Sequence, residues 1–104
     1  MTTTTIHHIQ TPRISASRAL ARTLAADLPY ELRDQDVELN ARGTIKVTEN
    51  FTRELAHILL VERTAGTIIV GGTVPGMYEG LKAYAEEISL PDAVKQNPLF
   101  RRFA

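Results

Sequence analysis

The chain of 104 residues contains no cysteine and no tryptophan, and its aromatic residues are three tyrosines and three phenylalanines. Without cysteine it cannot form a disulfide, use a thiolate as nucleophile or bind zinc through thiolates. It also lacks an excess of charge, since twelve basic residues balance twelve acidic ones. A neutral chain has no overall electrostatic attraction to nucleic acids or to anionic membranes. The composition therefore argues against both kinds of partner.

Long hydrophobic runs are missing too. No apolar stretch approaches the roughly twenty residues needed to span a bilayer. The start, MTTTTIHHIQ, has neither the basic region nor the apolar region of a signal peptide. We therefore expect a cytoplasmic protein. Its length suits one domain over residues 1–104, in which residues 1–5 could be disordered and residues 91–104 form a C-terminal tail.

Short β-branched runs alternate with segments of helical periodicity along the chain. The expected strands cover residues 2–10, 37–40, 44–47 and 66–72, and the expected helices lie within residues 14–28, 51–62 and 73–90. Such alternation predicts an α/β fold with a small, mostly parallel sheet of about four strands and helices mainly on one face. Residues 91–96 are expected to form a turn that leads to the tail NPLFRRFA.

Local signals refine these elements. Ser15 or Ser17 is the expected N-cap of the first helix, and Pro75 suits the first turn of the third. The apolar positions of each element predict a buried core. Its expected members are Leu20, Leu24, Leu39, Val47, Leu55, Leu59, Ile69, Leu81 and Ile88.

Residues that could carry chemistry are few. His7 and His8 are neighbours in a strand, so their side chains point to opposite faces and cannot chelate one ion. His57 has no second ligand at helical spacing. The glycine-rich GGTVPG, residues 71–76, follows a strand as a phosphate cradle would, but it lacks the lysine and hydroxyl of a P-loop. We expect a tight turn there, no metal site, no cofactor and no enzyme.

A different kind of site is suggested by three polar residues, Thr48, Glu49 and Asn50, where a strand meets a helix. They could simply cap the helix, with Thr48 or Asn50 accepting free backbone N–H groups and Glu49 beside the positive helix end. Capping does not require three polar residues in a row, however. A recognition site at this strand–helix joint, residues 48–51, is the alternative, and the residues alone leave both open.

The stretch around the joint, VELNARGTIKVTENFTRELAHILL, resembles the central motif of STAS-like domains, which are relatives of bacterial anti-sigma-factor antagonists. The strand, its turn and the start of the following helix carry the resemblance. The matching positions are Val37, Leu39, Gly43, Val47, Phe51, Glu54 and Leu55. The segments SRALARTLAADL and TIIVGGTVPGMYEGLKAYAEE look like the preceding helix and the next strand and helix, so the similarity extends over residues 15–88.

The resemblance implies a compact α/β domain that binds a protein partner, often a serine kinase of the histidine-kinase-like ATPase type. In that family a serine at the joint is phosphorylated, which adds about two negative charges. Two positions depart from the pattern. Asn40 stands where aspartate is usual, and Glu49 occupies the position of the phosphorylated serine.

The expected function is therefore a regulatory, non-catalytic protein-interaction domain. The expected partner-binding residues are Thr48, Glu49, Asn50, Phe51 and Arg53, and the candidate phosphate acceptors are Thr48 and Thr52. Two alternatives remain. One is a structural protein or a homodimer formed through an exposed strand edge, and the other is a small-ligand or anion-binding domain that uses residues 71–76.

Overall fold

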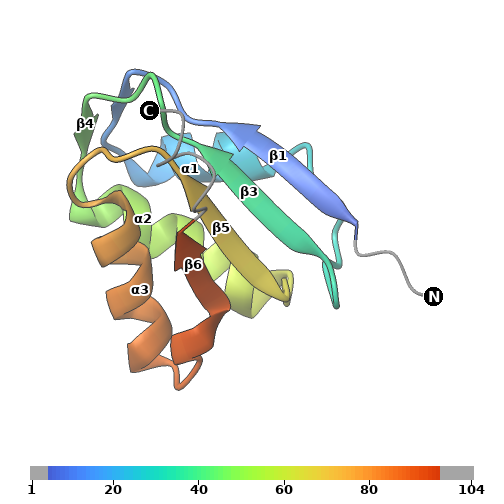
Figure 1. The fold of residues 1–104 in the computed structure, drawn as a ribbon. Helices are drawn as coiled ribbons and strands as arrows, with labels where there is room; N and C mark the ends of the chain where they lie inside the picture. The colour runs from blue at the N-terminus through green and yellow to red at the C-terminus, as the bar shows by residue number, and fades with distance from the viewer. Residues whose placement is uncertain (1–4, 97–104) are drawn as a thin grey trace.

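Four parallel strands form the main sheet of the computed structural model, which describes residues 5–96 (Figure 1). The strands are β1 (Ile6–Gln10), β3 (Asp36–Asn40), β5 (Thr67–Gly71) and β6 (Val94–Gln96), and they are neighbours in that order. All three pairings are parallel. The predicted α/β fold with a small parallel sheet is confirmed.

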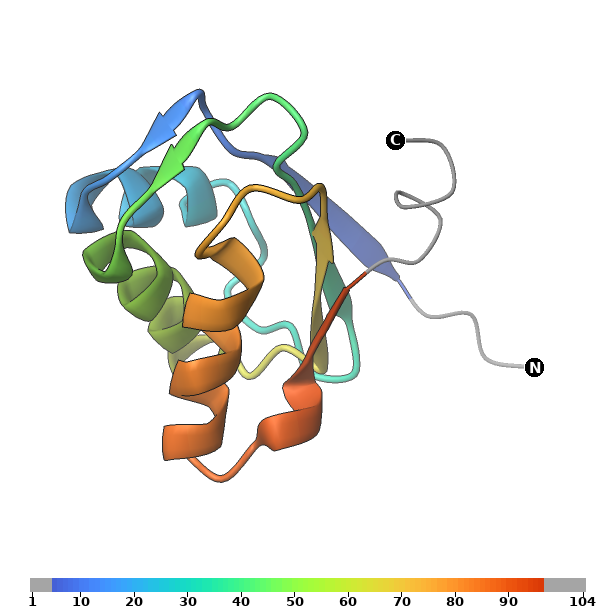
Figure 2. The same ribbon diagram turned by 60° about the vertical axis from the view of Figure 1, so that its left-hand side comes forward.

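Within the described residues, the helices cover one face of this sheet, as Figure 2 shows with the sheet nearly edge-on. They are α1 (Arg18–Ala25), α2 (Glu49–Ala56) with its continuation η1 (His57–Glu62), and α3 (Met77–Glu87). Because successive strands are neighbours, right-handed crossovers place each connecting helix on the same side. None of these helices is long and apolar enough to cross a membrane.

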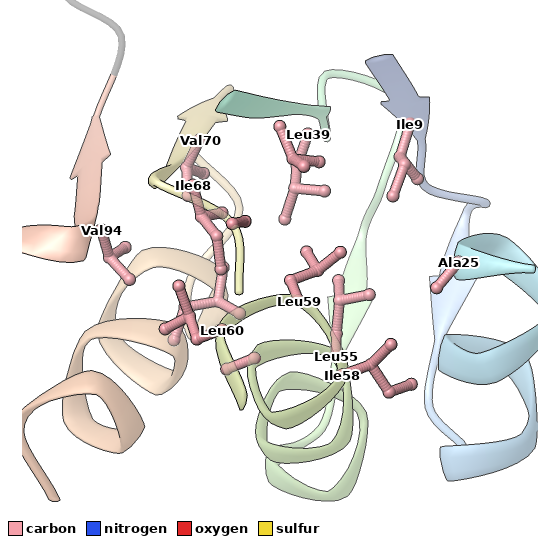
Figure 3. Close-up of a cluster of buried hydrophobic side chains, with 14 of the residues drawn as sticks. Ile9, Ala25, Leu39, Leu55, Ile58, Leu59, Leu60, Ile68, Val70 and Val94 are labelled. Carbon is pink, nitrogen blue, oxygen red and sulfur yellow. The ribbon is translucent and has the colours of Figure 1, made fainter. Parts of the chain in front are cut away.

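The core lies between the covered face of the sheet and the helices. Figure 3 shows Leu39 and Ile68 of the sheet above Leu59 and Leu60 of η1. The other face of the sheet, called the open face, is not covered by any helix within residues 5–96 (Figure 2). In β3, Val37 and Leu39 are buried, whereas the alternate residues, such as Glu38, are only half-buried.

The predicted core is partly correct. Leu39, Leu55, Leu59 and Leu81 are fully buried. The other predicted members are only half-buried, namely Leu20, Leu24, Val47, Ile69 and Ile88. In α1 the small residues Ala21 and Ala25 are fully buried, whereas Leu20 and Leu24 pack against the core while partly exposed, and Ile69 lies on the open face of β5.

A π-helical segment, η1, extends α2 by six residues. Its widened turn is closed by bonds such as Arg63 N–H to the Ile58 carbonyl, at 2.9 Å. Three consecutive residues, Ile58, Leu59 and Leu60, are buried there. A π-helix has about one residue more per turn than an α-helix. We infer that this extra residue lets three consecutive side chains face the core, which the 3.6-residue period of an α-helix does not predict.

The helix starts are set by local residues. Ser17 caps α1 by accepting from the Leu20 N–H at 3.1 Å, which confirms one of the two predicted caps. Pro75 does not begin α3, which starts at Met77. Gly76 is the N-cap, with a φ of 92° that favours glycine, and its N–H donates to Glu79 Oε1 at 2.9 Å.

Three short strands were not predicted correctly. Residues 91–96, expected as a turn, form a 3₁₀ turn, η2 (Pro91–Ala93), and strand β6 at the sheet edge. In addition, β2 (Ile14–Ser15) and β4 (Lys46–Val47) pair as a separate two-stranded sheet. The expected strand 44–47 is therefore reduced to its last two residues. The apolar tail beyond residue 96 and the start of the chain before residue 5 lie outside the described residues.

Candidate functional site

The strand–helix joint is built around Thr48, the N-cap of α2. Its hydroxyl oxygen accepts from the Phe51 N–H at 3.4 Å, and the hydroxyl donates to the Ala16 carbonyl at 2.8 Å. Its own N–H donates to the Ser15 carbonyl at 3.1 Å. Thr48 therefore caps α2 and also ties the joint to the segment before α1. Phosphorylation of this hydroxyl would remove its hydrogen and with it the bond to the Ala16 carbonyl.

Glu49 and Asn50 are exposed on the first turn of α2. Among the described residues, neither side chain has a hydrogen-bond or ion-pair partner, and the charge of Glu49 raises the pKa of Arg53 less than Glu87 does. Since Thr48 provides the side-chain cap, these two side chains are free to contact another molecule. They are the part of the predicted site that the fold leaves on the surface.

Phe51 and Thr52 correct the predicted site, because both are fully buried. The Phe51 ring belongs to the core cluster and does not face a partner. The Thr52 hydroxyl donates to the Glu49 carbonyl at 3.1 Å and lies against Gly80 of α3. A kinase cannot reach this hydroxyl in the folded domain, so Thr52 is not a phosphate acceptor.

Arg53 is half-exposed and bound to α3. Its guanidinium donates to both carboxylate oxygens of Glu87 and lies 5.2 Å from the centre of the Tyr84 ring. The hydrogen bonds to Glu87 raise the pKa of Arg53, and the same bonds lower the pKa of the Glu87 carboxyl. This predicted site residue therefore already has a partner within the domain, and it connects α2 to α3.

A second ion-pair group lies on the same helical layer, and no sequence signal indicated it. Arg22 of α1 pairs through Nε with Glu54 at 2.8 Å and donates to both carboxylate oxygens of Glu62, at 3.1 and 2.8 Å. His57 lies between the two groups, with Nδ1 2.8 Å from the Tyr84 hydroxyl and Nε2 3.3 Å from Glu62.

Around His57 and Tyr84 the surface has a depression of about 270 Å³, whose lining also includes Arg18, Arg53 and Glu54. The pairings of Arg22 and Arg53 leave little net charge in it. It is a rigid polar surface beside the joint, without the excess of positive charge that would concentrate anions.

The Arg22–Glu62 pair gives a pH prediction. The hydrogen bond from Arg22 holds the pKa of Glu62 below its ordinary value of 4.5. This carboxyl therefore contributes stability above the unfolded-state pKa and loses that contribution as the pH falls through the folded-state pKa. In Arg22→Gln, NMR titration of the Glu62 carboxyl should show a higher pKa. The pKa of Glu87, which depends on Arg53, should not change and serves as the control. If Glu62 has the same pKa in the unmodified chain and in Arg22→Gln, the Arg22–Glu62 pair does not persist in solution.

Two exposed isoleucines belong to the segments of the small β2–β4 sheet, whose strands lead into α1 and α2 (Figure 2). Ile14 is in β2, and Ile45 directly precedes β4. Ile14 is 56% exposed and Ile45 is 62% exposed. The two segments are joined by the bond from the Ile45 N–H to the Arg13 carbonyl, at 2.8 Å. The sequence did not single out either isoleucine, because their place beside the joint depends on the pairing of segments about thirty residues apart.

The remaining candidates have structural roles. Gly72 has a φ of 112°, and a Cβ there would lie 3.0 Å from the Ala41 carbonyl carbon, so the turn needs glycine. Together with the cap at Gly76, this explains two of the three glycines in residues 71–76. Over residues 5–96 there is no group of three or more histidine, aspartate or glutamate side chains that could hold a metal ion.

Comparison of the chain with protein-family models, with curated proteins and with solved structures gave no match.

Proposed function

We propose that the chain is a non-catalytic, STAS-like interaction domain of the cytoplasm, which regulates a protein partner by binding it through the joint. The contact residues are Glu49 and Asn50, and Thr48 holds them in place. The compact α/β fold is of the kind that the resemblance implies. Arg53 contributes as a half-exposed cation anchored by Glu87.

The observation that carries this proposal is that the side chains of Glu49 and Asn50 form no hydrogen bond or ion pair with the rest of residues 5–96. Thr48 provides the side-chain cap, and neither neighbouring side chain is bonded within the described residues. Exposed polar residues on a rigid, capped helix start can contact a partner without first being ordered, so binding costs less conformational entropy. Ile14 and Ile45 are exposed on the segments that lead into the joint and add apolar area near it.

Glu49 gives the joint a permanent negative charge. In the family that the chain resembles, the matching serine carries a phosphate with about two charges and three acceptor oxygens. A carboxylate has one charge and two oxygens, so Glu49 provides part of this signal without a kinase. By the same resemblance, the partner is a histidine-kinase-like ATPase that recognises the charged joint.

Photo-crosslinking in native cells tests the joint directly. We expect p-benzoylphenylalanine at position 50 to form a covalent adduct with one distinct protein. The same probe at position 86, where Glu86 is exposed on α3 without a side-chain partner, should not form it. Mass spectrometry of the adduct would identify the partner and show whether it belongs to the ATPase class.

Removing the charge completes the test. Glu49→Ala should weaken partner binding about tenfold, while Glu86→Ala should leave it unchanged. The free energy of unfolding should fall by no more than about 1 kcal/mol in Glu49→Ala, because the charge near the helix dipole contributes little. Unchanged affinity together with that small loss of stability would mean that Glu49 serves the helix end alone and that the joint is not the binding site.

A further inference from the structure

The two edges of the main sheet differ in how they are protected against pairing with another strand. Strand β6 has three residues, includes the exposed Lys95, and is followed in the sequence by Asn97 and Pro98. Short length and lysine or proline are common ways to prevent edge-to-edge association. Strand β1 has five residues, and from residue 5 to residue 11 there is no lysine, arginine, aspartate, glutamate or proline. The β1 edge therefore has none of these protections.

The backbone of β1 offers regular unpaired groups at this edge. The Asp36 N–H donates to the Thr5 carbonyl at 3.0 Å, and the Thr11 N–H donates to the Asn40 carbonyl at 3.1 Å. In a parallel ladder, alternate residues bond to the same neighbour, so the odd-numbered residues of β1 bond to β3. The N–H and C=O groups of residues 6, 8 and 10 point outward. Within residues 5–96 no other strand pairs with them.

We propose that β1 pairs in antiparallel fashion with β1 of a second copy of this chain, about a two-fold axis at His8. Only even-numbered residues have outward groups, so only they can form the hydrogen-bonded pairs of the new ladder. The register centred on His8 pairs it with its own copy and pairs Ile6 with Gln10 of the other chain. All three outward residues of each strand are then used, which gives about six hydrogen bonds.

A second copy fits this edge better than an unrelated strand because the edge is self-complementary. A two-fold axis brings identical strands together, and the absence of formally charged residues from 5 to 11 means that no Lys, Arg, Asp or Glu of β1 opposes itself. The nearest acidic group is Glu38, whose Oε1 lies 3.1 Å from His8 Nδ1 of its own chain. That carboxylate would offset any positive charge on the two histidines at the axis.

The dimer would form one continuous sheet with both helical layers on the same side. This follows because the two-fold axis of an edge-to-edge pair is perpendicular to the sheet. The residues of β1 do not include Glu49 or Asn50. The test of self-association can therefore fail while the test of partner binding succeeds, and the reverse. The proposal thus goes beyond the interaction at the joint.

Cysteine crosslinking tests both the edge and the register, because the chain has no cysteine of its own. In a hydrogen-bonded antiparallel pair the facing Cα atoms lie about 5.5 Å apart, within the roughly 4.4–6.8 Å that a disulfide spans. His8→Cys should therefore form a covalent dimer under mild oxidation. Ile6→Cys should not, since its copy would lie four residues away along the ladder, roughly 14 Å. Equal crosslinking at both positions, or none at position 8, would overturn the proposal.

Mass in solution gives the second measurement. The unmodified chain should dimerise as its concentration is raised, and His8→Pro should weaken the dimer about tenfold or more, since each copy loses a donor at the axis. The missing N–H points away from β3, so the fold should persist, which circular dichroism can verify. His8→Glu, which places two further carboxylates at the axis beside the Glu38 of each copy, should act similarly, while Lys95→Ala should have no effect.

Three outcomes would contradict the proposal. The unmodified chain could stay monomeric at every concentration, or it could form a dimer that both His8 variants retain. A dimer lost only when residues 97–104 are deleted would instead place the interface at the tail.

Discussion

Replacing Phe51 with alanine is expected to lower the free energy of unfolding by about 3–5 kcal/mol. The ring is fully buried and is among the largest fully buried side chains of the domain. Alanine would remove its apolar contacts and leave a cavity between helices that can close only partly. Since a small domain has a total stability of about 5–15 kcal/mol, much of it would be lost. Denaturant unfolding monitored by circular dichroism measures the change.

Asn50 provides the matched control, because it is the preceding residue on the same helix turn but is exposed. Asn50→Ala should change the stability by less than about 0.5 kcal/mol. The comparison separates the two roles that a residue at the joint can have. If Phe51→Ala is as stable as the unmodified chain but no longer binds the partner, the ring contacts the partner and the assignment of Phe51 to the core is wrong.

The second large effect is expected at Gly80, in the middle of α3. A Cβ built there would lie 2.4 Å from Thr52 Oγ1 and 2.9 Å from Thr52 Cβ, so α2 and α3 approach closely at this point. In an open helix, alanine is more favourable than glycine by about 1 kcal/mol. Here the buried Thr52 cannot move aside, and Gly80→Ala should instead cost about 1–3 kcal/mol through overpacking.

A double-mutant cycle tests that cause. Thr52→Ala removes Oγ1 and the methyl group but keeps Cβ, which lies 2.9 Å from the added Cβ, so the cost of Gly80→Ala should fall in the Thr52→Ala background without vanishing. Gly43→Ala is the control, since no atom outside its chain neighbours lies within 4 Å of a Cβ built there. Costs that add without coupling would show that the two helices do not meet through these residues.

Short-range signals were enough for the main elements. The β-branched run of β5 between glycines, and the apolar spacing that leads to Leu55 and Leu59, indicate a strand and a helix without knowledge of distant residues. The caps at Ser17 and Thr48 depend on backbone groups three positions away. Alternation of such elements limits the topology to a parallel sheet, because right-handed crossovers leave few arrangements.

The candidate site was predicted only in part. Its place at the start of a helix and the capping role of Thr48 follow from local chemistry. The sequence did not distinguish Phe51 as a core residue from Phe51 as a contact for a partner, because an aromatic side chain serves both purposes equally well. Burial of that ring depends on where α1 and α3 lie, and the exposure of Glu49 and Asn50 depends on the same packing.

What the sequence by itself determined was the set of elements held by bonds and contacts within a few residues. Only the tertiary structure decided the strands β2 and β6, which have two and three residues and too little length for a periodic pattern, and the pairing of β4 with β2 in a separate sheet. It alone decided the link from Arg22 to Glu62, forty residues apart, and the approach of Gly80 to Thr52. These features arise when the helices pack on the sheet, because their energy comes from partners that a local pattern does not contain.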